Sequence, residues 1–117
     1  MAAASKLSLP TATLDGRRFD GIVLECGKTA GDADSLIFEG GRFRSTACDR
    51  YGYGDGPYTA SAYIGEIAFE AVTESPKYGQ LRWSGIVRGT RLDGMLTMVR
   101  DGVAAGDKWV LAGQVQP

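Results

Sequence analysis

The residues most able to carry out binding chemistry in this chain gather between Cys48 and Tyr58, in the stretch CDRYGYGDGPY. Tyrosine gives a broad contact area at low entropic cost together with a polar tip, and loops of this kind often carry binding functions. The alternative is that the tyrosines close one end of the fold and the glycines only permit the path of the chain. The candidate binding residues in and beside this stretch are Arg44, Arg50, Tyr51, Tyr53, Asp55 and Tyr58.

Catalytic chemistry has little support in the sequence. The chain has no histidine, which removes the commonest general base and metal ligand. The aspartate pairs Asp32 with Asp34 and Asp49 with Asp55 offer an acid and a base, or calcium ligands, but the spacing of a calcium loop is absent. The glycines of the tyrosine stretch also lack the following lysine of a phosphate loop. We therefore expect a protein that is not an enzyme and that has no metal and no cofactor.

The two cysteines are Cys26 and Cys48. They end the first and third predicted strands, and because the second strand runs the opposite way, both lie at the same end of the fold. Two strands with one other strand between them lie ~9.6 Å apart, whereas a disulfide needs Cα atoms within about 7 Å. Cys26 and Cys48 are therefore disulfide candidates only if the chain segments beyond the two strands approach each other, and two free thiols are the alternative.

Length and charge restrict the classes of protein that this chain can belong to. A chain of 117 residues forms one domain, and its net charge of −1 shows no electrostatic footprint for nucleic acid. Its apolar runs are far shorter than the ~20 residues that span a bilayer. Pro10 disfavours a long helix near the start, so we expect a flexible N-terminal arm over residues 1–14 and a single domain over residues 15–117.

Apolar residues alternate with polar ones through most of the chain, which is the period of a half-buried strand. Gly40 and Gly41 supply the positive φ values of a type I′ hairpin turn, and residues 101–107 are expected to form a longer hairpin loop. The predicted strands span residues 18–26, 35–39, 42–47, 58–64, 66–73, 80–88, 91–100 and 108–115. Short connections between successive strands favour an all-β fold, a small eight-stranded antiparallel up-and-down barrel of calycin-like type. A two-sheet β-sandwich is the alternative.

Alternation also predicts which side chains face the barrel interior. In the last strand it favours Trp109, Leu111, Gly113 and Val115 as the inward set. Gly85, Gly94 and Gly113 are expected to mark bends of a closing sheet, or less favourably to make room for a ligand. The bulky side chains expected inside are Phe38, Phe43, Phe69, Trp83, Leu96, Met98 and Trp109. Because an eight-stranded barrel is only just wide enough for side chains to fill, they favour a filled interior.

Several of these residues resemble the pattern of a family of small exported bacterial proteins of uncharacterised function. The residues that carry the likeness are Asp34, Leu36, Phe38, Gly41, Phe43, Ser45, Cys48, Tyr51, Gly52, Tyr53, Tyr58, Trp83, Gly85, Leu92 and Gly94. The resemblance implies a periplasmic or secreted setting and no activity. In fold, the C-terminal part is similar to lipocalin and avidin-like barrels. The opening MAAASKLSLP shows no signal peptide, and it reads either as a mature start left after signal cleavage or as an unstructured terminus.

The sequence thus predicts an exported, non-enzymatic binding module that acts through the tyrosine stretch at one barrel mouth. A carrier of a small apolar ligand inside the barrel is the first alternative. A carboxylate-dependent enzyme or a structural or inhibitory module is the second. The expected partner is a protein or a small apolar ligand, with no nucleic acid and no membrane span, and the oligomeric state is left open.

Overall fold

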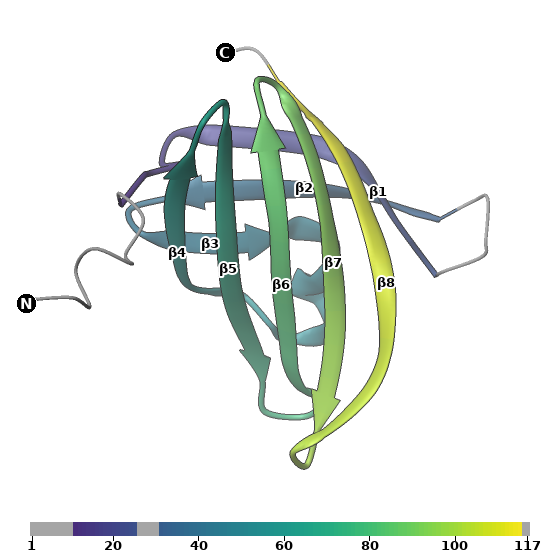
Figure 1. Cartoon of the computed structure of the whole chain (residues 1–117). Coiled ribbons are helices and arrows are strands. Elements are labelled where there is room, and N and C mark those ends of the chain that lie inside the picture. Colours follow the sequence, from purple (N-terminus) through teal and green to yellow (C-terminus); the bar gives the residue numbers. More distant parts are fainter. Residues whose placement is uncertain (1–10, 26–30, 116–117) are drawn as a thin grey trace, which may run out of the picture.

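The computed structural model of the chain describes residues 11–25 and 31–115. Its strands form one closed antiparallel barrel in which each strand pairs with its neighbours in sequence, and β1 also pairs with β8 (Figure 1). The elements are β1 (Arg17–Glu25), β2 (Asp32–Glu39), β3 (Arg42–Ser45), the 3-10 helix η1 (Thr46–Tyr51), β4 (Asp55–Tyr63), β5 (Glu66–Ser75), β6 (Gly79–Arg88), β7 (Arg91–Arg100) and β8 (Val103–Gln114). The predicted all-β, eight-stranded up-and-down barrel is confirmed, and the sandwich alternative is wrong.

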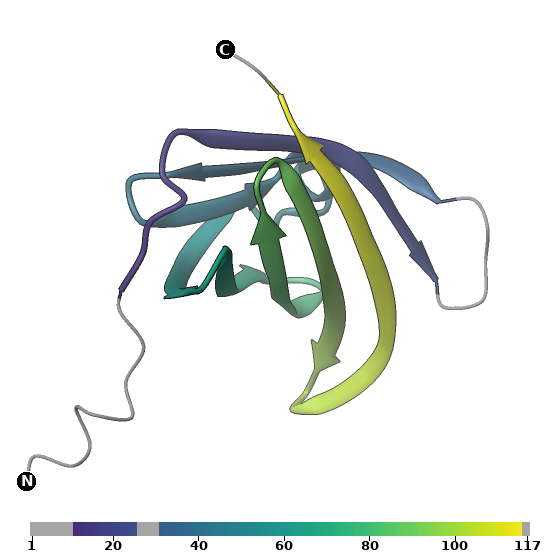
Figure 2. The ribbon, with the colours of Figure 1, turned by 45° about the horizontal axis from the view of Figure 1, so that its top comes forward.

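The barrel is strongly coiled, because β1, β2 and β3 run across the direction of β4 to β8 (Figure 1). The same crossing is visible when the top of the molecule is turned forward (Figure 2). Since the strands alternate in direction, the β2–β3, β4–β5 and β6–β7 turns lie at one end, which we call the closed end. Helix η1 and the β5–β6 and β7–β8 turns lie at the other, which we call the open end.

Two hairpins test the turn predictions. Gly40 and Gly41 both have positive φ, 57° and 75°, as predicted for the β2–β3 turn. The long loop predicted over residues 101–107 is wrong, since the β7–β8 turn is only Asp101 and Gly102, with φ of 53° and 78°. Aspartate tolerates the left-handed region better than most residues, so the strands pair up to the turn itself.

Aromatic side chains fill the closed half of the barrel. Phe38 is at the centre, with ring centroids 5.9 Å from Phe19, 5.1 Å from Phe43 and 5.2 Å from Phe69. Phe19, Phe38 and Phe43 are fully buried, and each such side chain contributes about 1.5–3 kcal/mol of transfer free energy. The closed half therefore holds the main hydrophobic core.

Residues 11–16 cover the closed end. The Leu14 side chain is fully buried there, and the Ala12 N–H donates to the Ala60 carbonyl at 3.0 Å. The Tyr58 hydroxyl accepts from the Leu14 N–H at 2.9 Å and donates to the Asp15 carboxylate at 2.6 Å. This bond lowers the pKa of Asp15, while burial raises the pKa of Tyr58. The predicted arm, residues 1–14, lies largely outside the described residues, and its last four residues lie against the barrel.

The inward face predicted for the last strand is wrong. Residues directly opposite in an antiparallel pair share one face, and Leu92, Gly94 and Leu96 of β7 lie opposite Ala112, Val110 and Lys108 of β8. Trp109 and Leu111 are therefore on the outer surface, where 47% and 39% of their areas are exposed. Apolar residues occupy both faces of this strand, so alternation alone does not fix which face is inward, and a one-residue shift reverses it.

Two of the three strand glycines lie where the backbones approach closely. Gly85 is opposite Gly94, and a Cβ at Gly85 would lie 2.8 Å from the Asp93 carbonyl oxygen and 2.9 Å from the Phe69 ring. The Phe69 ring thus occupies the space that the glycine leaves, which supports a bend and not a ligand site. At Gly113, in contrast, no atom lies within 4 Å of the Cβ position.

We expect Gly85→Ala to lower the free energy of unfolding by about 1–3 kcal/mol, the usual cost of overpacking a tight site. Gly113→Ala is the matched control, because its added methyl group meets open space and should leave stability unchanged or slightly raised. Urea unfolding followed by tryptophan fluorescence measures both values. Equal stability of the two variants would contradict the close approach of β6 and β7.

Candidate functional site

A cavity of about 340 Å³ opens at the end of the barrel that carries η1. Leu81, Trp83 and Leu96 form its deep wall and are only 3–4% exposed. The Trp83 ring packs on Phe43 with centroids 4.9 Å apart, and its indole N–H donates to the Thr73 hydroxyl at 3.2 Å. Trp83 therefore separates the cavity from the filled half of the barrel, so the interior is only partly filled.

Helix η1 begins directly after β3 and forms one side of the cavity through Ala47 and Cys48. Gly52 ends the helix in the left-handed region, with φ of 86°, and its N–H donates to the Asp49 carbonyl at 2.9 Å. Cys48 is half-buried, and this burial raises the pKa of its thiol above the ordinary value. The sequence gives no helical period here because six residues are too few to show one.

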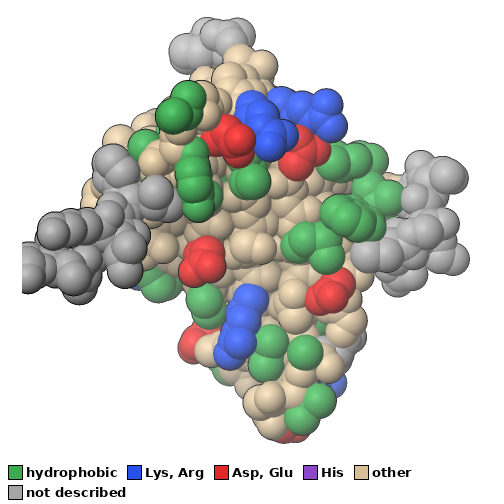
Figure 3. Space-filling model, viewed as in Figure 1, with side chains coloured by type: hydrophobic (Ala, Val, Ile, Leu, Met, Phe, Trp, Pro, Cys, Tyr) green, Lys and Arg blue, Asp and Glu red, His purple; other side chains and the backbone are tan. Residues whose placement is uncertain are grey.

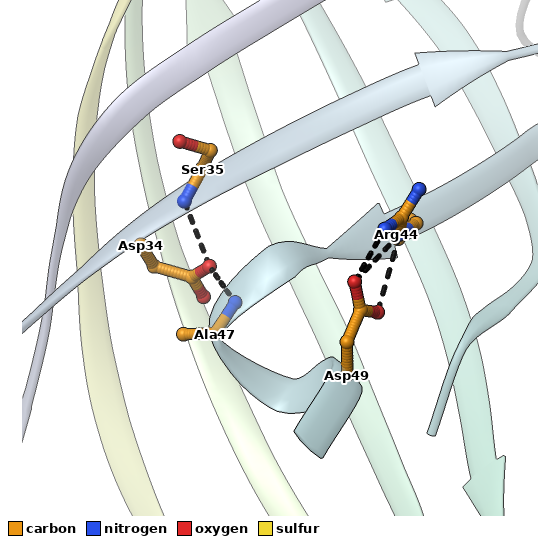
Figure 4. Close-up of polar contacts among 5 residues, drawn as sticks. All are labelled: Asp34, Ser35, Arg44, Ala47 and Asp49. Atoms are coloured by element: carbon orange, nitrogen blue, oxygen red, sulfur yellow. Dashed lines mark hydrogen bonds and ion pairs between the residues drawn. The ribbon is translucent and has the colours of Figure 1, made fainter. Parts of the chain in front are cut away.

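The buried carboxylate of Asp34 attaches η1 to the barrel wall (Figure 4). One of its oxygens accepts from the Ala47 N–H at 3.0 Å and from the Ser35 N–H at 2.7 Å. The other accepts from the Ser45 hydroxyl. The bond from Ala47 satisfies an N–H group in the first turn of the helix, which has no partner within it, so Asp34 holds the cavity wall in place.

A second carboxylate fixes η1 from the outside. Arg44 of β3 binds the Asp49 carboxylate, with Nε donating to both oxygens at 3.1 Å and 2.9 Å (Figure 4). The planar guanidinium suits this paired geometry. The contact lies on the barrel exterior and does not line the cavity.

Tyrosines surround the opening. Tyr78 lies in the β5–β6 turn. Its ring contacts Tyr51 edge to face, with ring centroids 5.7 Å apart, and stacks on Tyr53, with ring centroids 6.5 Å apart. The Ser75 hydroxyl donates to the Tyr51 carbonyl at 2.7 Å, which joins this turn to η1. Tyr53 is buried, which raises the pKa of its hydroxyl, whereas 44% of Tyr51 is exposed. The rim is thus a connected aromatic cluster with one ring available to solvent.

Charged groups of both signs reach the cavity. Arg50 lies over the Tyr51 ring, 5.0 Å from its centroid. Lys108 enters from the inner face of β8, and Asp32 lies exposed at the rim. Among the described residues, no group of three or more histidine, cysteine, aspartate or glutamate side chains is placed to hold a metal ion.

The structure brings together three of the six predicted binding residues, since Arg50, Tyr51 and Tyr53 line the cavity. The other three lie elsewhere. Arg44 binds Asp49 outside, Asp55 is paired with Arg42 at 3.0 Å, and Tyr58 lies at the closed end.

The disulfide prediction stays a prediction. Cys48 is a free cysteine in the structure and lines the cavity, and Cys26 lies outside the described residues.

Sequence reasoning missed Tyr78 and Lys108 as site residues. Tyr78 follows a proline turn and carries no local signal of its position. Lys108 would have been found if the face of β8 had been assigned correctly, because Val110 and Ala112 lie on the same side.

A second groove of about 530 Å³ crosses the outer surface of β4 to β7 and is lined mainly by polar and small side chains such as Ser61 and Ser84. Figure 3 looks onto this face, where charges of both signs are scattered and hydrophobic side chains gather toward the β7–β8 side. The groove is larger than the open-end cavity but is open to solvent along its length, so it offers a ligand little burial. The open-end cavity is the better candidate.

Removing the Asp34 carboxylate should destabilise the protein and loosen η1. In Asp34→Ala the Ser45 hydroxyl and the Ala47 N–H lose their acceptor, and each buried group left unsatisfied costs about 1–3 kcal/mol. Asp20→Ala is the control, because its ion pair with Arg18 is about half exposed and such pairs contribute little. We expect a clear drop of the urea midpoint for Asp34→Ala only. A similar change in both variants would contradict the role of Asp34.

Within the described residues, no helix has the length and apolar character needed to cross a bilayer. Comparison of this chain with protein-family models, curated proteins and solved structures gives no significant match.

Proposed function

We propose that this protein is a non-enzymatic binding module that holds a small apolar ligand in the open-end cavity, with the tyrosine cluster around the opening. The observation that carries the proposal is a cavity of about 340 Å³ with Trp83, Leu81 and Leu96 as its deep wall. Sites for small molecules usually measure about 300–1,000 Å³ and are lined mainly by apolar and aromatic side chains.

Two features of the cavity favour an apolar ligand. Most of the side chains that line it are apolar or aromatic, so a ligand that fills it removes apolar surface from water. The Asp34 carboxylate on its wall already accepts three hydrogen bonds and therefore needs no ligand partner.

The loop aspartates support a non-enzymatic role. Asp49 is held by Arg44 and Asp55 by Arg42, both on the barrel exterior. A general acid or base must reach the proton that it transfers, and neither carboxylate lines the cavity.

A protein partner bound at the same rim is the second candidate. It is favoured by Tyr51, which is 44% exposed with Arg50 stacked on its ring. Tyrosine and arginine are enriched among the few residues that carry most of the binding energy of a protein interface.

We also propose that the protein works outside the cytoplasm. The support is the resemblance to small exported bacterial proteins and the presence of two cysteines in the sequence. Disulfides persist mainly in oxidising compartments.

The ligand proposal predicts that the neutral apolar dye N-phenyl-1-naphthylamine binds one site per chain with increased fluorescence. Tyr51→Ala should weaken binding about two- to tenfold, the range expected for losing one aromatic contact. Tyr63→Ala is the matched control, because Tyr63 is similarly exposed, at 52%, but lies at the closed end. Fluorescence titration measures the three dissociation constants.

Two outcomes of this titration would overturn the ligand proposal. One is the absence of saturable dye binding. The other is binding that Tyr51→Ala leaves unchanged, which would place the dye on the outer apolar surface around Trp109.

The compartment proposal predicts that protein isolated from its natural host without reduction has a mass two hydrogens lower than the reduced chain. Such a loss indicates a bond between Cys26 and Cys48, since these are the only cysteines. Intact-mass spectrometry before and after reduction measures the difference, and the Cys48→Ser variant should show none. Identical masses for the wild-type chain would argue against the disulfide and against its use as support for export.

A further inference from the structure

We propose that the open-end cavity selects ligands with an anionic head group, an apolar carboxylate, and that Lys108 binds this group. The inference rests on the proposed function, because it names the class of ligand for the same cavity. It depends on where the register of β8 places one ammonium group.

Lys108 lies on the inner wall of the barrel. It is opposite Leu96, which is 4% exposed, and two residues before Val110, which is 3% exposed. Its side chain is half-buried and lines the cavity. The other lysine in the described ranges is Lys77, which is exposed and lies over the Tyr78 ring, 5.4 Å from its centroid. Lys108 is therefore the described lysine that the barrel turns toward its own interior.

No ion pair of Lys108 occurs among the side chains that the structure describes. Of the two carboxylates on the cavity wall, Asp34 is engaged by the Ser45 hydroxyl and by two backbone N–H groups. Asp107 accepts from the Thr97 hydroxyl at 2.7 Å, on the opposite side of β8. Asp32 lies exposed at the rim. Among the described side chains, no carboxylate is paired with the ammonium group of Lys108, which leaves this group to a ligand.

Because the ammonium group of Lys108 is partly buried, it favours anionic ligands over neutral ones. A neutral ligand that fills the cavity covers the charge without replacing its water, which is unfavourable. An anionic head group forms a charge-assisted hydrogen bond in the same place, stronger than a bond between neutral groups. Arg50 adds a second positive charge at the rim.

The geometry also orients the ligand. Its apolar body lies against Trp83, Leu81 and Leu96, which are the buried wall. Its carboxylate lies beside Lys108, which is nearer the open end than Val110, the next inward residue of β8. An acid with a single apolar tail or a flat aromatic body fits this arrangement.

The test compares decanoate with decan-1-ol, which share a chain length and differ in the charge of the head group, as competitors of N-phenyl-1-naphthylamine at neutral pH. We expect decanoate to bind the wild-type protein more tightly. Lys108→Met keeps the apolar stem and removes the charge, so it should weaken decanoate about ten- to hundredfold, the loss expected for a hydrogen bond to a charged group. Binding of decan-1-ol should be unchanged or tighter.

Two further variants serve as controls. Lys77→Met removes an exposed lysine outside the cavity and should change neither affinity, whereas Lys108→Arg should keep the preference for decanoate. Circular dichroism in the near ultraviolet checks that each variant keeps the native packing of its aromatic side chains.

The outcomes separate the two proposals. If decanoate and decan-1-ol bind equally well and Lys108→Met changes neither, the role of Lys108 is overturned while the cavity remains a ligand site. If neither competitor displaces the dye and the dye itself fails to bind, the proposed function is overturned, and the inference with it.

Discussion

The closure of eight short strands into one barrel is the constraint on which the rest of the structure depends. Pairing of β1 with both β2 and β8 leaves no free sheet edge. Closure also fixes, for every strand, which side chains face inward. The phenylalanines around Phe38 fill the closed half. Trp83 packs on this filled half, and the cavity lies between Trp83 and the open end. The cavity thus follows from where the bulky residues lie along the barrel axis.

The wall of the cavity depends on one buried polar group. Asp34 lies on β2, yet its carboxylate accepts hydrogen bonds from Ser45 and Ala47 at the end of β3 and the start of η1. Because these groups are taken out of water, losing their acceptor costs more than an exposed contact would. The same residue therefore links the stability of the barrel to the shape of the site, and the exterior contact between Arg44 and Asp49 supports it.

Much of the fold and the positions of three of the six candidate binding residues could be predicted from local patterns. The alternation in β5, in β6 and in β7 as far as Leu96, the paired glycines of the β2–β3 turn and the inward Trp83 are confirmed. Beyond Leu96 the register of β7 shifts, so that Met98, expected inside, is 36% exposed and Val99 is buried. Tyr51 and Tyr53 lie at a barrel mouth as expected. Arg44 and Asp55 do not join them, because β3 and β4 direct both side chains outward to their own ion-pair partners.

The sequence by itself determined the strand number, the antiparallel order and the position of the tyrosine stretch, because alternation and turn glycines are local signals. Only the tertiary structure decided the face of β8. Both faces of that strand carry apolar residues, so its orientation depends on the register with β7. That register turns Trp109 to the outside and Lys108 to the cavity. The position of the charged group in the proposed site is therefore a property of barrel closure and is not encoded in any short stretch of sequence.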